Sequence, residues 1–258
     1  MSAPISVVMC SRDDARFAAA TAVWARAMGW ADYEIVRIPD ARSMCEGYNR
    51  GVALAKHERL IFCHDDIEFL CDDLPGRLDA HFARFDLFGA AGTTKLIGPA
   101  YSYAGPPYVV GQVAHELPSR PLQLDVFAAP AASVGNVQAL DGTLMAVRRN
   151  VLDRVRWDER YDHFHLYDID FSFAAHRAGF AVGVACDLGL LHRSLGAFGT
   201  PEWNRAANLF MEKWLPALPP VPERLRRWTQ AQIFPLDRAD CAAAMREQLD
   251  RPPSAPPA

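Results

Sequence analysis

The chain has 258 residues, half of them hydrophobic, and a formal net charge of −4. This length and apolar content are enough to bury the core of one enzyme-sized domain, with or without a small appendage. Its 27 lysines and arginines are balanced by 31 acidic residues and form no long basic block, which excludes the electrostatic pattern of a nucleic-acid-binding protein.

The six cysteines are dispersed without a CxxC pair, which is typical of reduced core residues and not of a disulfide framework or a zinc site. The N-terminus has no signal-peptide pattern, and no segment is long and apolar enough to span a bilayer. A cytoplasmic location is therefore the default expectation.

The first part of the chain alternates between strand and helix patterns. Apolar runs predict strands at Ile5–Cys10, Tyr33–Ile38, Arg59–Cys63 and 87–92. Helical periodicity predicts helices between them at 17–28, 43–56 and 74–85. Such a series is typical of a right-handed, mostly parallel sheet flanked by helices. We expect this α/β half to form a nucleotide-binding layer.

The middle of the chain changes character. Residues 98–107 are rich in Gly, Pro and Tyr, and residues 118–130 show no helical period. They predict a long irregular loop that covers an active site. Regular patterns then return, and they predict strands at 143–147 and 188–192 and helices at 167–178, Pro201–Trp214 and 223–232. The proline-rich tail, 251–258, is expected to be disordered.

Three polar residues, His64, Asp65 and Asp66, follow directly after the apolar run at Arg59–Cys63. Ligands of open α/β sheets bind just outside the carboxyl ends of strands, so acids at this edge indicate a site for a hard divalent cation. Capping and solvation of the two acids are the alternative. The first strand is followed by neither GxGxxG nor a P-loop, which disfavours a dehydrogenase or a P-loop enzyme.

Several blocks of this sequence resemble the inverting glycosyltransferases of family 2, especially a branch related to a streptomycin-biosynthesis protein. The blocks are GYNRGVALA (47–55), FCHDDI (62–67), LDGTLMAVRR (140–149), YDIDF (167–171), RAG (177–179) and LHRS (191–194). The resemblance extends to about Trp214. It implies a GT-A fold, Rossmann-like with a central, mostly parallel sheet flanked by helices, over residues 1–215. Residues 216–250 are then expected to form a helical extension.

The resemblance implies a Mn²⁺ or Mg²⁺ site. Asp66, the last acid of the metal motif, is the first-choice ligand, and His192 completes the site, since neutral imidazole is acceptable to Mn²⁺. The motif reads His-Asp-Asp instead of Asp-x-Asp, so the roles of its first two residues stay open. Asp65 is assigned both to the metal and, with His64, to the donor. The alternative for His192 is a structural role, as a histidine at a strand end whose ring nitrogens are hydrogen-bonded within the protein.

The resemblance also makes Asp168 the general base, although Tyr167 replaces the glutamate of the family's Glu-Asp-x-Asp pattern. Asp168 and Asp170 lie two apart on a predicted helix and point to different faces, so they cannot both address one substrate atom. Helix capping is the alternative for one of them. Tyr167, Asp170, Asp141 and Gly142 are assigned to the sugar and acceptor site, with a simple Asp-Gly turn as the alternative for the last two.

Donor recognition is expected at the ends of the first two strands, because the carboxyl ends of parallel strands meet at one edge of the sheet. Ser11 and Arg12 follow the first strand, and Asp40 follows the second. Asn49 matches a residue of the family. Loop polarity, helix capping and helix packing are the alternatives at these positions.

Two groups of aromatic residues carry weaker expectations. Tyr101, Tyr103 and Tyr108 either stack on a sugar or acceptor or pack among themselves in a surface loop. Trp203 and Trp214 are eleven residues apart and match one helix face, which predicts core or interface residues and not ligand contacts.

The implied activity is that of a glycosyltransferase of EC class 2.4, which moves a sugar from a nucleotide-diphosphate sugar to an acceptor hydroxyl with inversion. The metal takes up the charge of the leaving diphosphate, and Asp168 deprotonates the acceptor. An inactive nucleotide-sugar-binding or scaffold protein is one alternative. A metal-dependent phosphoesterase built on His64, Asp65, Asp66 and His192 is another. The nucleotide, the sugar, the acceptor and the oligomeric state, a homodimer included, are left open.

Overall fold

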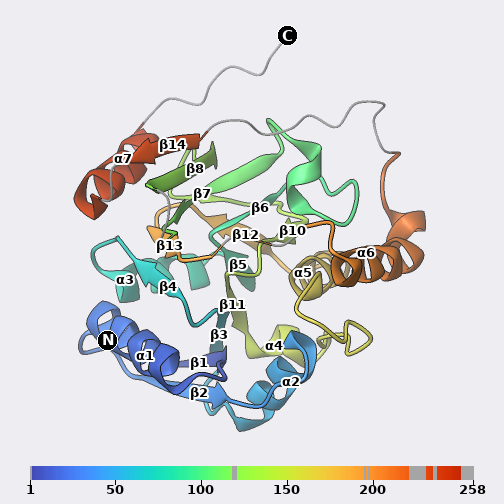
Figure 1. Ribbon diagram of the computed structural model, residues 1–258, viewed down its shortest axis with the longest axis horizontal. Coiled ribbons are helices and arrows are strands. Elements are labelled where there is room, and N and C mark those ends of the chain that lie inside the picture. Colours follow the sequence, from blue (N-terminus) through green and yellow to red (C-terminus); the bar gives the residue numbers. More distant parts are fainter. Residues whose placement is uncertain are drawn as a thin grey trace.

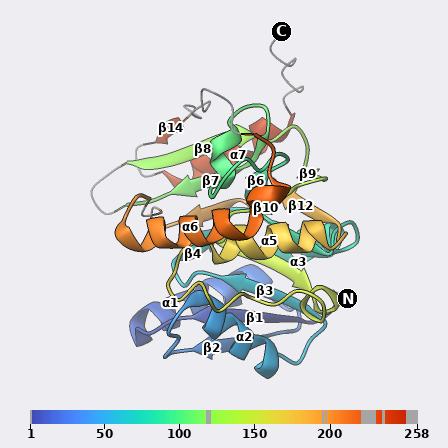
Figure 2. The ribbon, with the colours of Figure 1, turned by 90° about the vertical axis from the view of Figure 1, so that its right-hand side faces the viewer.

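The computed structural model describes residues 2–117, 121–194, 196, 198–220, 231–234 and 237–250. Within these ranges the strands form two mixed sheets, one above the other, with helices around them (Figures 1 and 2). Helices α1 (Asp14–Met28) and α2 (Met44–Leu54) lie at the end of the molecule formed by the first strands. Helix α7 (Arg238–Asp250) lies at the opposite end.

The first sheet contains seven strands, in the order β2 (Tyr33–Ile38), β1 (Ile5–Cys10), β3 (Arg59–Cys63), β11 (Leu144–Arg148), β5 (Leu87–Gly89), β12 (Val182–Ala185) and β9 (Ser133–Val134). Strands β2, β1, β3, β5 and β12 run in one direction, while β11 and β9 are antiparallel to their neighbours. The prediction of a central, mostly parallel sheet flanked by helices is therefore confirmed.

The helices begin and end close to the predicted positions. Helix α1 is capped by Asp13, whose carboxylate accepts from the Arg16 amide, and α2 by Ser43, whose hydroxyl accepts from the Glu46 amide. The predicted helix at Pro201–Trp214 matches α6 at both ends. The other helices are α3 (Leu74–Phe82), α4 (Arg149–Leu152) and α5 (Tyr167–Arg177), with 3₁₀ turns η1 (Tyr101–Ala104) and η2 (Leu215–Ala217).

Successive side chains of the central strands face opposite helix layers. Val8, Leu60 and Phe62 pack in one core with α2 and α5. Val7 and Ile61 pack in a second core with α1 and α3. Because helices cover both faces of this sheet, its inner strands are mostly apolar, and this is why their sequence pattern is easy to recognise.

The second sheet was not predicted. Its strands are β10 (Ala139–Leu140), β6 (Ala91–Thr93), β7 (Val109–His115), β13 (Leu190–His192) and β4 (Ile67–Phe69), with β8 (Leu122–Ala128) paired to β7 and β14 (Ala231–Phe234) paired to β8.

Two expectations about the middle of the chain were wrong. The predicted strand at 87–92 is divided at Ala90, so that β5 belongs to the first sheet and β6 to the second. The predicted irregular span contains the long strands β7 and β8. In β7 the apolar pattern is interrupted by Gln112, a buried polar residue that donates to the carbonyls of Cys186 and Met245, and the pairing with β8 shifts register between Gly111 and Gln112.

The C-terminal expectations fall partly outside the described residues. Of the helix predicted at 223–232, residues 223–230 lie outside them, and Gln232 belongs to strand β14 instead. The predicted disordered tail, 251–258, also lies outside them. Helix α7 falls within the expected extension 216–250. None of the helices in the described ranges has the length and apolar content needed to cross a membrane.

Candidate functional site

The register of the two sheets brings separated segments to one place. The amide N–H of His64, just beyond β3, donates to the carbonyl of Thr143, just before β11, at 3.1 Å. In the second sheet β13 pairs with β4 so that His192 lies opposite Ile67, one residue after Asp66. The segment between β3 and β4 therefore lies beside both the 141–143 turn and the end of β13.

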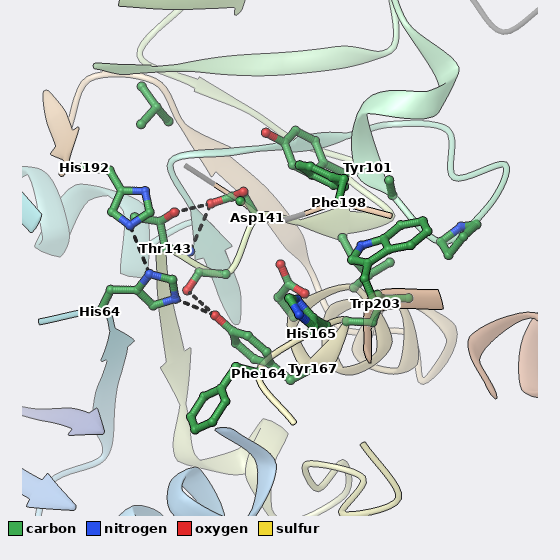
Figure 3. A pocket seen from close by; sticks show the side chains of 18 of the residues that line it. His64, Tyr101, Asp141, Thr143, Phe164, His165, Tyr167, His192, Phe198 and Trp203 are labelled. Atoms are coloured by element: carbon green, nitrogen blue, oxygen red, sulfur yellow. Dashed lines mark hydrogen bonds between the residues drawn. The ribbon is translucent and has the colours of Figure 1, made fainter. Parts of the chain in front are cut away.

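His64, Asp66 and His192 form a group in which one ligand atom from each lies within 4.8 Å of the others. His192 Nε2 lies 3.1 Å from His64 Nδ1 (Figure 3), and it lies 3.2 Å from Asp66 Oδ1. It also lies 2.9 Å from the hydroxyl of Ser194. No other group of three such side chains is found among the residues that the structure describes.

The charges of this group suit a cation. Burial alone would raise the pKa of Asp66, but the hydrogen bond and charge of His192 outweigh it and hold that pKa well below its usual value. Desolvation and the neighbouring His192 lower the pKa of His64. At neutral pH the group therefore offers a carboxylate and a neutral imidazole, which is the protonation state that metal binding requires.

The ligand atoms of this group indicate which metal ion would fit. Two imidazole nitrogens and one carboxylate oxygen suit Mn²⁺ and related transition-metal ions. Mg²⁺ prefers an all-oxygen shell and suits this set less well. The residues present are therefore compatible with a metal ion, and His64 joins Asp66 and His192 as a candidate ligand.

Asp65 does not belong to this group. Its carboxylate accepts from the Ser11 hydroxyl at 2.7 Å and from the Arg16 guanidinium at 2.6 Å. Asp65 and Asp66 both lie in the turn between β3 and β4, and their carboxylates have different partners, because Asp66 contacts His192. Arg16, which sequence reasoning missed, also lies 3.4 Å from Asp66 and is largely exposed. Only its position early in the first helix indicated that it would be near this edge.

A small pocket of about 210 Å³ opens at this edge. It is lined by Cys10, Arg16, Met44, His64, Asp65, Asp66, Phe164 and Ser194. The pocket thus combines one exposed guanidinium with two candidate metal ligands, His64 and Asp66, and this combination suits an anionic group such as a diphosphate.

The other predicted donor residues lie at different distances from this pocket. Arg12 donates to the carbonyl of Ala41 at 2.5 Å, and its guanidinium lies 5.6 Å from the ring centre of Phe164, which lines the pocket. Asp40 is exposed and forms a 2.7 Å ion pair with Arg50 on the surface of α2.

Asn49 is also turned elsewhere. Its side-chain amide donates to the carbonyl of Trp157 at 3.0 Å and to the carboxylate of Glu159 at 2.8 Å. Neither Asp40 nor Asn49 lines this pocket or the larger cavity that adjoins it. The contacts of Asn49 match the alternative role in helix packing, because they connect α2 to the segment before α5.

A larger cavity of about 400 Å³ adjoins the pocket and shares His64 and Phe164 with it. In Figure 3, His64 and His192 stand on one side, and Tyr101, Phe198 and Trp203 gather on the opposite side, with Asp141 between them. The cavity therefore has one end with candidate metal ligands and one aromatic end.

Asp168 lines this cavity from the first turn of α5. Burial, followed by the charge of Asp141, raises the pKa of Asp168 to about 7, against the opposing effect of backbone N–H groups. A carboxyl group with this pKa is half deprotonated at neutral pH and is basic enough to accept a proton there. The predicted base thus lines the same cavity as His64 and His192.

The turn at Asp141–Thr143 is shaped by close contacts. The Asp141 carboxylate accepts from the Thr143 amide and hydroxyl, at 3.0 and 2.5 Å, so the predicted Asp-Gly turn is also present. A Cβ at Gly142 would lie 2.4 Å from the Tyr167 hydroxyl and 2.7 Å from Asp168 Cβ. Glycine is therefore what lets this turn approach the start of α5.

Asp170 does not reach the cavity. Its carboxylate accepts from Trp214 Nε1 at 2.7 Å, from Lys213 Nζ at 2.8 Å and from the Tyr161 hydroxyl at 3.2 Å. Two residues along a helix correspond to about 200°, so Asp170 faces α6 while Asp168 faces the cavity. The assignment of Asp170 to the sugar site is not what the structure shows, and its contacts fasten α6 to α5.

The aromatic residues divide in the same way. Of the three tyrosines, Tyr101 lines the cavity, whereas Tyr108 is exposed beside Lys95. Trp214 packs edge-on against Phe173, as expected for a core residue. Trp203 packs against the core as expected, and it also lines the cavity from the first turn of α6.

Sequence reasoning also missed the wall that the second sheet contributes. Val113 and His115 from β7 and Asp125 and Phe127 from β8 line the cavity. The alternation of β8, with Leu122, Leu124 and Val126 buried on its other face, was a usable signal for a strand with one face toward a site.

The fold, with its mostly parallel sheet and the acidic edge after β3, is that of a GT-A glycosyltransferase. The chain belongs to the family described as "Glycosyltransferase like family", whose model matches residues 6–212. Among curated proteins none matches this sequence.

Two solved structures are similar to this chain at low sequence identity. The crystal structure of GalNAc-T7 with UDP, GalNAc and Mn²⁺ has a TM-score of 0.54 and 10% identity, and the match covers 83% of this chain and 48% of that one. The chain therefore spans about half the length of that protein. TarS from S. aureus, residues 1–349, gives a TM-score of 0.44 at 11% identity, with 74% and 60% of the two chains covered.

Proposed function

We propose that this protein is a metal-dependent, inverting glycosyltransferase that transfers a sugar from a nucleoside-diphosphate sugar to an acceptor hydroxyl. The observation that carries the proposal is the meeting of two elements at one cavity. The candidate metal group His64, Asp66 and His192 lies at one end, and Asp168, with its pKa of about 7, lines the same space.

The donor is proposed to bind across the two cavities. His64, Asp66 and His192 would hold the ion, with Mn²⁺ as the best fit, and a bound divalent ion would neutralise the charge of the leaving diphosphate. Arg16 is exposed in the pocket and would meet a phosphate oxygen there. The presence of UDP and Mn²⁺ in GalNAc-T7, which shares the fold, supports this placement.

Asp168 is proposed as the general base. It would accept the proton of the acceptor hydroxyl while that oxygen bonds to the anomeric carbon and the bond between that carbon and the diphosphate oxygen breaks. One carboxylate acting as a base supports a single displacement from the face opposite the leaving group, which inverts the anomeric configuration. The charge of Asp141 favours this transfer, because it raises the basicity of Asp168.

The aromatic end of the cavity is proposed as the acceptor site. Tyr101, Phe198 and Trp203 would cover the apolar face of a hydroxyl-bearing ring. In the described part of the chain, no lysine or arginine lines this cavity, whereas Asp125, Asp141 and Asp168 do. An acceptor that carries a phosphate or carboxylate is therefore disfavoured here.

The test is thermal unfolding with a panel of nucleoside diphosphates and nucleotide sugars, each with and without Mn²⁺. A nucleotide at a hundred times its dissociation constant adds about 2.7 kcal/mol to the free energy of unfolding. We expect one nucleotide to raise the melting temperature only with Mn²⁺, and Asp66→Ala to abolish that rise. With that donor, Asp168→Asn should bind normally and fail to transfer. A panel without any Mn²⁺-dependent shift would contradict the proposal.

The phosphoesterase alternative is less well supported. Such an enzyme normally needs ligands for a second ion. The described residues supply one three-residue group, and Asp65 is taken up by Ser11 and Arg16. Rapid donor hydrolysis that no acceptor diverts would be the result that favours it.

A further inference from the structure

His64 is held through both of its ring nitrogens. Nδ1 faces the candidate metal group, 3.1 Å from His192 Nε2 and 4.0 Å from Asp66 Oδ1. Nε2 lies on the other side of the ring, 2.8 Å from the hydroxyl of Tyr167 (Figure 3). That hydroxyl in turn donates to the carbonyl oxygen of Gly142 at 3.1 Å.

This chain of contacts decides where the proton of His64 lies. A tyrosine hydroxyl has one proton, and a carbonyl oxygen can only accept. Both contacts can be hydrogen bonds only when the Tyr167 hydroxyl donates to Gly142 and accepts from His64 Nε2–H. A neutral His64 with its proton on Nε2 has its lone pair on Nδ1, which points toward Asp66 and His192.

The Tyr167 ring is itself firmly placed. Its side chain is almost completely buried. It packs edge-on against Tyr48, with ring centres 5.8 Å apart, and at a tilt against Trp157, with ring centres 6.1 Å apart. The absence of a side chain at Gly142 leaves room for the hydroxyl. The Tyr167 side chain is therefore held in one rotamer, and its hydroxyl is a fixed acceptor for His64.

We infer that Tyr167 is a positioning residue, which holds His64 in the tautomer and orientation that can bind a metal ion. The inference rests on the proposed metal dependence. It also relates two departures from the motif of this family, because His64 and Tyr167 contact each other. A carboxylate at position 64 would need no tautomer to be selected, whereas a histidine does.

The first test examines the metal-free protein. Long-range ¹H–¹⁵N spectra of the histidine rings would be compared for the wild type, Tyr167→Phe and the control Tyr48→Phe. The Tyr48 hydroxyl is buried and has no hydrogen-bond partner among the described residues, so its removal matches the change in the same core. We expect His64 to carry its proton on Nε2 in the wild type and the control, and to become a mixture of tautomers in Tyr167→Phe.

The second test measures Mn²⁺ affinity, from the electron paramagnetic resonance signal of free Mn²⁺. Loss of an outer-shell partner typically costs about 10- to 100-fold in metal affinity, so Tyr167→Phe should bind Mn²⁺ at least about tenfold more weakly, with Tyr48→Phe close to the wild type. In a His64→Ala background, Tyr167→Phe should cause little further loss, since its effect is expected to act through His64.

The outcomes separate this inference from the proposed function. A wild type that binds Mn²⁺ together with a Tyr167→Phe protein that binds it equally well would overturn the inference and leave the metal site intact. An equal loss in the His64→Ala background would show a general structural effect and overturn it as well. A wild type that binds no Mn²⁺ would overturn both the inference and the metal dependence of the proposed function.

Discussion

Asp141 and Asp168 line the same cavity, and burial together with the charge of Asp141 raises the pKa of Asp168 to about 7. Two carboxylates in one partly enclosed space oppose each other's ionisation. Asp141 therefore affects the proposed base without having to touch the substrate.

Asp141→Asn should move the pH dependence of transfer. A general base must be deprotonated, so the wild-type rate should rise with pH through about 7. Removing the charge of Asp141 lowers the pKa of Asp168, and the rise should shift to lower pH. The check is the pH profile of kcat/KM. Asp125→Asn, which changes another cavity carboxylate, should leave the midpoint in place, and an unshifted Asp141→Asn profile would rule out this coupling.

Asp168→Asn should stabilise the protein above neutral pH. The pKa of Asp168 is higher in the folded than in the unfolded chain, so the folded state binds more protons between about 4 and 7. The free energy of unfolding of the wild type therefore falls as pH rises through this window. Above the window Asp168 is ionised in both states, and the whole loss of stability remains. The variant lacks this cost, on the order of 2 kcal/mol after allowing for cavity water. Urea unfolding at pH 5 and pH 8 tests this, and equal differences at both pH values would contradict it.

Asp65 and Asp66 should differ sharply although they are neighbours. Asp66→Asn removes a candidate ligand and should weaken Mn²⁺ binding at least about tenfold. Asp65→Asn should nearly preserve Mn²⁺ affinity, but it releases Arg16 and should weaken binding of a nucleoside diphosphate. Titration calorimetry with Mn²⁺ and then with the nucleotide separates the two effects. Loss of Mn²⁺ binding in Asp65→Asn would restore that residue as a ligand.

Trp203→Ala should weaken the acceptor and spare the donor. Loss of one stacking face costs about 1 kcal/mol, or about fivefold in the KM of the acceptor. Methyl glycosides serve as probe acceptors, and Trp30→Ala, which removes a fully exposed tryptophan, is the control. Equal rises in donor and acceptor KM would place Trp203 outside the acceptor site.

The first sheet was predictable because strands such as Ile5–Cys10 and Arg59–Cys63 are buried on both faces and end in polar residues. The second sheet was not, because Gln112 interrupts the apolar pattern of β7 and its contacts are distant in sequence. This omission hid the wall of the cavity that β7 and β8 form.

The site shows a similar limit. The family resemblance selected Asp66, His192 and Asp168. The structure groups Asp66 with His192, and His192 and Asp168 line one cavity. The resemblance wrongly placed Asp170 in the sugar site, because the partners of Asp170 are Lys213 and Trp214, which are remote in sequence. Which of two nearby acids faces the cavity depends on packing that no local pattern encodes.

Gly142→Ala should damage the site because the added methyl group clashes with neighbouring side chains, and not because of backbone strain. Its Cβ would meet the Tyr167 hydroxyl at 2.4 Å and Asp168 Cβ at 2.7 Å, and the buried Tyr167 ring cannot move freely. Overpacking of this kind costs about 1–3 kcal/mol.

The displaced Tyr167 and Asp168 should also lower both Mn²⁺ affinity and transfer. Gly135→Ala is the matched control, because its Cβ would meet only Phe85, at an ordinary 3.6 Å. Thermal unfolding and Mn²⁺ titration of both variants test the idea. If Gly142→Ala kept the stability and Mn²⁺ affinity of Gly135→Ala, the turn would have to be looser than these contacts allow, and the support of His64 by Tyr167 would lose its geometric basis.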